Sequence, residues 1–265
     1  MSPNTNILEL SGVTKVFADD YGTRKKVLEN ITFKIPSGSS KITTILSSFG
    51  GGKSTLLKII AGVEKPSSGE IRLEEKKYLQ ASGKIVLIPE KSASLPWLNV
   101  RENIELACRL ETCIKNEDGY KVEDLINLVG LSGYESHYPD NHSFGFRFRI
   151  SLARALILNP FVLLLDDCFK KMDAATREEI YSLISNISGE IDTHFLLATT
   201  DVLEAIRLSG RIFLMSKNPG RIYKEIKISQ NLIHDYNNEK FEEYKRMIEE
   251  AYNKENQLGT MNFSI

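Results

Sequence analysis

The feature that most restricts the fold of this chain is a glycine-rich loop between an apolar run and a helical pattern. The sequence reads "KITTIL" at 41–46, "SSFGGGKST" at 47–55 and "KSTLLKIIAG" at 53–62. The first run predicts a buried strand, and the apolar spacing of the last predicts a helix that ends at Gly62. A strand, a glycine loop and a helix in this order predict a phosphate-binding loop in an α/β fold.

The residue types in the loop suit phosphate chemistry. Glycines let the backbone curl so that successive N–H groups point at phosphate oxygens, and the following helix adds its N-terminal partial charge. Lys53 can reach the β- and γ-phosphates, and the Ser54 hydroxyl can ligate Mg²⁺. Against the pattern GxxxxGK[ST], Ser47 replaces the first glycine. We predict nucleotide binding by Ser47, Ser48, Phe49, Gly50, Gly51, Gly52, Lys53, Ser54 and Thr55.

A second candidate is the apolar run "VLLLDD" at 162–167, which ends in two acids. Because α/β sheets bind ligands at the carboxyl ends of their strands, Asp166 is placed to join a Mg²⁺ shell. Asp167 is then the candidate to polarise an attacking water. The simpler alternative is a buried strand with a polar end.

Elsewhere the chain alternates between strand and helix patterns. Bounded β-branched runs predict antiparallel strands at 7–10, 12–17 and 31–35. Helical periodicity dominates residues 100–156, and further helices are expected from Ala174 and Val202. Apolar runs predict strands at 69–73, 83–89, 161–167, 194–199 and 211–216. The later strands are apolar throughout, which favours a parallel sheet covered on both faces.

Size and composition describe an ordinary soluble protein. With 265 residues and a net charge of -1, the chain can bury a large core but carries no overall field to attract nucleic acid. The N-terminus lacks a signal pattern, and no apolar run approaches the roughly 18 residues that span a bilayer. Cys108, Cys113 and Cys168 lack CxxC spacing, so reduced thiols are expected.

The C-terminal tail carries one more amphipathic pattern. In "NNEKFEEYKRMIEEAY" at 237–252, an apolar stripe falls on one face of a charged helix. This stripe predicts a helix that packs on the domain, with a partner-binding helix as the alternative. Its members are Phe241, Tyr244, Ile248 and Ala251.

Taken together, these motifs resemble the nucleotide-binding subunit of an ABC transporter over about residues 6–230. The subgroup that imports nitrate, sulfonates and taurine matches best at four segments, namely "LLKIIAGVEKPSSGEI", "LPWLNVRENI", "RISLARALILNP" and "NPGRI". The resemblance implies a P-loop NTPase with a mostly parallel core sheet and an N-terminal antiparallel β subdomain. It implies one ABC ATPase domain over 1–265, with an inserted helical subdomain at about 100–156 and a helical tail at about 231–265.

Roles carried over from the family divide into retained and altered positions. Phe17 matches the aromatic that stacks on adenine, although a half-buried strand phenylalanine is the alternative. Ser54 and Asp166 match the Mg²⁺ ligands. Glu90 matches the glutamine that links Mg²⁺ to the transporter contact loop.

The altered positions are those that carry catalysis. The resemblance aligns Asp167 with the catalytic glutamate, Thr200 with the histidine that contacts the γ-phosphate, and Cys168 with a proline. Asp167 is one methylene shorter than glutamate, and small losses of reach can cost roughly a hundredfold in rate. The signature LSGGQ, which caps the nucleotide on the opposite subunit, reads "HSFGF" and contains Ser143, Phe144, Gly145 and Phe146.

The resemblance therefore implies an ATP-binding subunit of an importer for small oxyanions, with ATP and Mg²⁺ bound and hydrolysis impaired. Its expected partners are a transmembrane permease and a second ATPase subunit, identical or different, with no nucleic acid. Its expected place is the cytoplasmic face of the cell membrane. The alternative is a catalytically inactive regulatory or scaffolding subunit. A soluble ABC protein of translation or DNA repair fits less well, because the chain has no long coiled-coil insertion.

Overall fold

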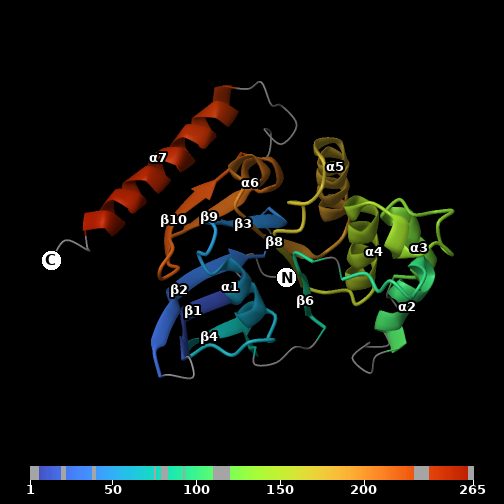
Figure 1. Cartoon of the computed structure of the whole chain (residues 1–265), viewed down its shortest axis with the longest axis horizontal. Helices are drawn as coiled ribbons and strands as arrows, with labels where there is room; N and C mark the ends of the chain where they lie inside the picture. Colours follow the sequence, from blue (N-terminus) through green and yellow to red (C-terminus); the bar gives the residue numbers. More distant parts are fainter. Residues whose placement is uncertain are drawn as a thin grey trace. The chain divides into compact units, whose positions relative to one another are not determined.

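The computed structural model describes residues 6–18, 22–37, 40–74, 76–78, 83–91, 93–109, 120–229 and 239–261. They fall into two compact units, which we describe separately. Figure 1 labels the helices and strands. Unit 1 comprises Met1–Ile59, Glu64–Leu79 and Leu197–Ile265, and unit 2 comprises Ile60–Val63 and Gln80–Leu196. Cys113 lies outside the described residues. Within the described ranges, no helix is long and apolar enough to cross a lipid bilayer.

Unit 1 contains an antiparallel sheet with the strand order β2-β1-β4-β5. Its strands are β1 (Asn6–Ala18), β2 (Arg24–Pro36), β4 (Ser68–Leu73) and β5 (Lys76–Lys77). The predicted antiparallel region is thus confirmed, but the two strands expected at 7–10 and 12–17 are one strand. A register shift between Leu10 and Val13 lets β1 bend, and Gly12 supplies the required φ of 64°.

Unit 1 also contains strands of a second sheet, which lie in the order β10-β9-β3-β8. The strands are β3 (Ile42–Leu46), β8 (His194–Thr199), β9 (Arg211–Met215) and β10 (Ile222–Lys227). All five residues of β3 are buried, and β3 pairs with β9 in parallel. The sequence analysis missed β10, which pairs antiparallel with β9. Its burial does not alternate along the strand, so periodicity gave no signal.

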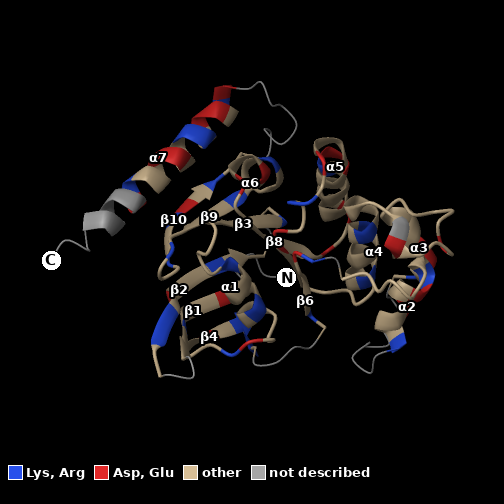
Figure 2. Cartoon of the chain, in the orientation of Figure 1, with Lys and Arg blue, Asp and Glu red and all other residues tan. Residues whose placement is uncertain are grey.

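Helix α7 (Glu239–Met261) packs against α6 (Val202–Leu208) and the neighbouring strands of unit 1. Phe241 and Ile248 are buried in this cluster, and Tyr244 and Ala251 lie against it. Acidic and basic residues both lie along the helix (Figure 2). The predicted apolar stripe is therefore a packing face, which confirms that interpretation for the described residues.

Unit 2 combines strands with the helical segment expected at 100–156. It contains β6 (Ile85–Ile88) and β7 (Val162–Asp166), which pair in parallel, and the first half of β8. Three helices pack on one another, namely α2 (Val100–Arg109), α3 (Val122–Leu128) and α4 (Phe144–Leu156). A short 3₁₀ turn, η1 (Pro139–Asn141), precedes α4, and α5 (Ala174–Glu190) follows β7.

The packing of α7 can be tested at Ile248, whose side chain is fully buried. We expect Ile248→Ala to lower the free energy of unfolding by about 2–5 kcal/mol, because it leaves a cavity in the cluster. The matched control is Glu249→Ala, which removes an exposed side chain on the same helix and should change stability by about 0.5 kcal/mol or less. Chemical denaturation measures both, and equal effects would contradict this packing.

Candidate functional site

The glycine loop forms the turn that the sequence predicts. It follows β3 and ends where α1 (Lys53–Ile60) begins. Gly50 and Gly52 adopt φ values of 79° and 95°, a left-handed region that disfavours side chains. The Lys53 side chain is 5% exposed, and its ammonium donates a hydrogen bond to the Ser47 carbonyl (3.0 Å). The ammonium is therefore held against the loop, while Ser48, Phe49, Gly50 and Ser54 are exposed and Thr55 is half-buried.

Ser47, which departs from the loop pattern, is accommodated by Gly51. The Ser47 side chain is 1% exposed, and its hydroxyl makes no hydrogen bond to another described residue. A Cβ added at Gly51 would overlap that hydroxyl and lie 3.1 Å from the Ser47 Cβ. The space that a side chain at residue 51 would need is thus filled by residue 47. Sequence reasoning missed this pairing, because the pattern leaves residue 51 unrestricted.

Thr200 lies near the start of the loop. The backbone N–H of Ser47 donates to the carbonyl of Thr199 (3.3 Å), so the ends of β3 and β8 meet in unit 1. Thr200 is the next residue and is exposed. Asp201 accepts hydrogen bonds from the N–H groups of Leu203 (2.8 Å) and Glu204 and thereby caps α6.

Phe17 lies at the end of β1 in unit 1, and 40% of its side chain is exposed. The Lys15 ammonium lies 4.7 Å from the ring centroid. Lys15 also pairs with Glu64 (2.6 Å) and donates to the Lys65 carbonyl (2.8 Å). The hydrogen bond from Lys15 holds the pKa of the Glu64 carboxyl below its usual value. An exposed ring whose neighbouring cation is anchored in this way can stack on a planar ligand.

The two acids predicted at the end of β7 differ in their backbone. Asp166 is the last residue of the strand and is 6% exposed. Asp167 has a φ of 46°, a left-handed conformation that aspartate tolerates better than most residues. The Cys168 thiol then donates to the carbonyl of Ile88 at the end of β6 (3.3 Å). This backbone conformation therefore sets the direction in which the Asp167 side chain leaves the main chain.

Glu90 is an exposed residue that follows β6 in unit 2. Parallel pairing of Ile88 with Leu165 brings the chain ends that carry Glu90 and Asp166 to one edge of the sheet. Glu90 lies 3.9 Å from the Lys171 ammonium. Of the predicted metal ligands, Ser54 belongs to unit 1 and the two acids to unit 2. Among the described residues, no three His, Cys, Asp or Glu side chains form a metal-ligating group.

The signature segment opens helix α4 in unit 2. The Ser143 hydroxyl caps the helix by accepting a hydrogen bond from the Phe146 N–H (3.2 Å). Phe144 is 40% exposed, and the Arg147 guanidinium lies over its ring at 4.7 Å. The His142 ring stacks on Phe146 at 4.0 Å. The Ser143 hydroxyl thus accepts one hydrogen bond from the helix and keeps its own donor and a second lone pair.

The first turns of α4 and α5 also meet. A Cβ at buried Gly145 would overlap the Thr176 side chain, so this signature glycine permits close packing. Asp173 caps α5 by accepting from the Thr176 N–H (2.9 Å), and this bond lowers the pKa of its carboxyl. Phe148 is buried in α4 and packs edge-on against Phe169 at 5.3 Å. Its ring thus contributes to the packing between α4 and the segment that follows β7.

Known proteins resemble this chain over most of its length. The family model described as ABC transporter matches residues 28–170. The chain is 36% identical over 241 residues to an aliphatic sulfonates import ATP-binding protein of Bacillus cereus, covering 91% of this chain and 94% of that protein. It is 31% identical over 222 residues to the nitrate import ATP-binding protein of Synechocystis sp., covering 84% of this chain and 82% of that protein.

A solved structure supports the fold independently. The dimeric structure of MJ0796, a bacterial ABC transporter cassette, superimposes with a TM-score of 0.70 at 24% identity. The match covers 84% of this chain and 99% of that chain. The α/β fold of a P-loop NTPase, which the resemblance to ABC transporter subunits implied, is thereby confirmed.

The pairing of Ser47 with Gly51 predicts a specific rescue. We expect Gly51→Ala to destabilise the protein by about 1–3 kcal/mol, because its methyl group overlaps the Ser47 hydroxyl. In the Ser47→Gly background the same change should cost at least about 1 kcal/mol less. Denaturation of the four proteins gives the coupling energy directly. An equal cost in both backgrounds would show that the two positions are independent.

Proposed function

This chain belongs to the ABC transporter family, and we propose that it is the ATP-binding subunit of an importer for small oxyanions such as nitrate, sulfonates or taurine. Its relatives are import ATP-binding proteins for aliphatic sulfonates and for nitrate. The observation that carries the proposal is the glycine loop, with its positive-φ glycines and with Lys53 held against it. Such a loop provides the N–H groups and the cation that phosphates require.

We assign nucleotide binding to the residues named for the loop, with Phe17 stacking on adenine. Mg²⁺ would be held by Ser54, Glu90 and Asp166, whose oxygen atoms are the hard ligands that this cation prefers. When bound, Mg²⁺ would neutralise charge on the β- and γ-phosphates. Lys53 binds the same phosphates, and the exposed Ser54 hydroxyl can turn toward the cation.

We propose that the chain hydrolyses bound ATP slowly. Asp167 would orient water with a short side chain from a left-handed backbone. Thr200 can donate one hydrogen bond to a γ-phosphate but cannot carry charge. Phe144 places an exposed ring where the family has a glycine that approaches phosphate closely. The three changes together favour slow turnover.

The proposed assembly follows the family. Two ATPase subunits, identical or different, would sandwich nucleotide beneath a transmembrane permease on the cytoplasmic face of the cell membrane.

The loop before α2 is held by Asn103 and offers a surface for such a partner. The buried Asn103 side chain donates to the carbonyls of Leu95 (3.1 Å), Leu98 (2.8 Å) and Asn99 (2.9 Å). These bonds hold a loop that presents Trp97, which is 69% exposed and suits a protein contact. We propose that residues 1–265 act as one ABC ATPase domain in this assembly.

The altered catalytic positions favour a second candidate. In this alternative the chain is a catalytically inactive regulatory or scaffolding subunit that pairs with an active ABC ATPase. Nucleotide would then serve as a structural ligand. Asp167, Thr200 and Phe144 support this alternative as well as slow turnover, so hydrolysis has to be measured.

Binding is tested by thermal unfolding with Mg-ATP. At about 100 times its dissociation constant, the nucleotide should stabilise the protein by about 2.7 kcal/mol. Lys53→Ala should abolish this shift, because it removes the cation held against the loop. Lys58→Ala, which changes an exposed lysine of the same helix, should preserve it. The absence of any shift in the native protein would refute the binding proposal.

Turnover separates the two candidates. We expect the native protein to hydrolyse ATP at less than about 1 per second, below the usual enzyme range. The double variant Asp167→Glu with Thr200→His should hydrolyse faster, although a glutamate at the left-handed position costs about 1 kcal/mol of stability. Steady-state phosphate release measures both rates. No gain would assign the defect to Phe144, and fast native turnover would refute impaired hydrolysis.

A further inference from the structure

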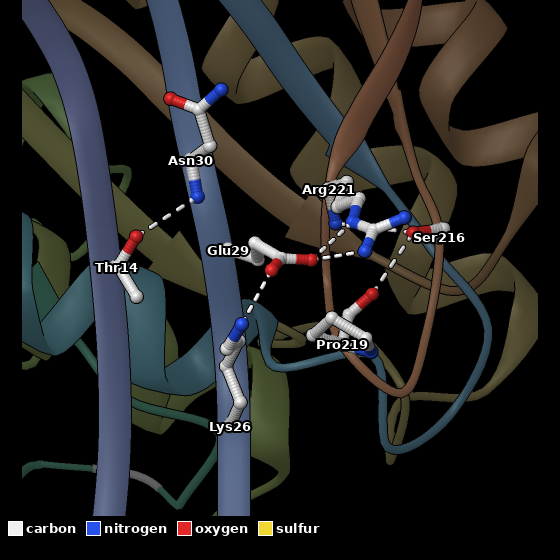
Figure 3. Close-up of polar contacts among 7 residues, drawn as sticks. All are labelled: Thr14, Lys26, Glu29, Asn30, Ser216, Pro219 and Arg221. Carbon is white, nitrogen blue, oxygen red and sulfur yellow. Dashed lines mark hydrogen bonds and ion pairs between the residues drawn. The ribbon is translucent and has the colours of Figure 1, made fainter.

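The segment at 216–221, which we call the 216–221 loop, connects β9 to β10 and contains most of the motif "NPGRI". It is closed by its own polar groups (Figure 3). The Ser216 hydroxyl donates to the Pro219 carbonyl (3.0 Å) and accepts from the Arg221 N–H (3.1 Å). The Ser216 N–H donates to the Arg221 carbonyl (2.9 Å). These hydrogen bonds hold the 216–221 loop in one defined conformation.

Strand β2 holds this loop through both backbone and side chains. The Glu29 N–H donates to the Gly220 carbonyl (2.9 Å), and the Gly220 N–H donates to the Val27 carbonyl (2.8 Å). The Arg221 Nε donates to Glu29 Oε2 (2.6 Å), and Lys26 donates to the other carboxylate oxygen. Figure 3 shows Arg221 and Lys26 approaching Glu29 from opposite sides. Glu29 therefore joins β2 to the loop.

The charge on Glu29 is secured by the same contacts. Hydrogen bonds from Lys26 and Arg221 hold the pKa of its carboxyl below the usual value. The carboxylate is therefore ionised at neutral pH. The pair is partly exposed, with 57% of the Arg221 side chain and 24% of the Glu29 side chain accessible. Because water reaches the guanidinium, we expect the pair itself to contribute only modestly to folding.

The other side of the loop contacts the phosphate-binding loop. A Cβ at Gly220 would overlap the Gly51 carbonyl oxygen and lie 3.1 Å from the Leu28 side chain. A Cβ at Gly52 would lie 2.9 Å from the same Leu28 side chain and 3.3 Å from the Val27 carbonyl. The backbones of residues 51–52, 27–28 and 220 are therefore packed without room for an extra atom.

We propose that the 216–221 loop is a positioning element for the phosphate-binding loop, with Gly220 as the contact and the Glu29–Arg221 pair as its anchor. Because the peptide group is planar and trans, a Gly51 carbonyl that faces Gly220 directs the Gly52 N–H away from Gly220. That N–H is one of the donors that a phosphate loop offers its ligand. The proposal rests on nucleotide binding by this chain and assigns a role to the motif "NPGRI".

The contact is tested by Gly220→Ala, which the backbone allows because Gly220 is not among the residues with positive φ. Its methyl group should displace Gly51 and raise the dissociation constant of Mg-ATP by roughly tenfold or more, as expected for a lost hydrogen bond to a charged ligand. The control is Gly189→Ala, whose Cβ meets no atom within 4 Å in α5. Titration with a fluorescent ATP analogue measures affinity, and thermal unfolding monitors the fold.

The anchor is tested by charge reversal. Glu29→Arg and Arg221→Glu should each weaken Mg-ATP binding several-fold with little change in melting temperature, and the double variant should restore it to within about twofold of the native value. Weakening in both single variants together with restoration in the double variant supports the proposal, since net charge alone would shift the affinity for anionic ATP in opposite directions in the two single variants. Native binding that is unchanged in Gly220→Ala and in both reversals would overturn the positioning role alone. Absence of native binding would refute the proposed function and this role together.

Discussion

The conformation of the glycine loop in unit 1 depends on close packing around Gly51. The Ser47 hydroxyl occupies the space of a Gly51 side chain, and Gly220 lies against the Gly51 carbonyl. Residue 51 is therefore enclosed by the end of β3 and by the loop that follows β9. The glycine loop lies between the buried strand β3 and helix α1. The Lys53 ammonium donates a hydrogen bond to the Ser47 carbonyl at the start of this loop. A loop with an atypical first residue can thus keep the curl that phosphate binding requires.

Unit 2 carries Asp167 and Phe144, two of the three positions on which the proposal of slow hydrolysis rests. Strand β7 places Asp166 at its carboxyl end, as parallel sheets do for ligand-binding residues. The next residue, Asp167, turns into a left-handed conformation, and the Cys168 thiol attaches the chain to β6. Asp167 and the anchored Cys168 form one local arrangement. Its left-handed backbone suits aspartate better than most residues.

The signature segment is held by aromatic contacts and close packing. The Arg147 guanidinium lies over the Phe144 ring, the His142 ring stacks on Phe146, and Phe148 packs edge-on against Phe169. A side chain at Gly145 would overlap Thr176 of α5. The aromatic side chains of this segment therefore have partners within unit 2 and are compatible with helix α4. The exposed ring of Phe144 is the feature on which the proposal of a weakened nucleotide contact rests.

Elements whose signals are local could be predicted from the sequence. The order of strand, glycine loop and helix around Lys53, the acid-ended strand at Asp166 and the amphipathic face of Ile248 follow from short-range periodicity and turn chemistry. Other features become visible only in the folded chain, namely the pairing of β10 with β9, the overlap that links Ser47 to Gly51, the left-handed Asp167 and the contact between Gly220 and the phosphate-binding loop. Most of these depend on the exact spacing of backbones that lie far apart in the chain, as Gly51 and Gly220 do. No pattern within a short window of sequence records that spacing.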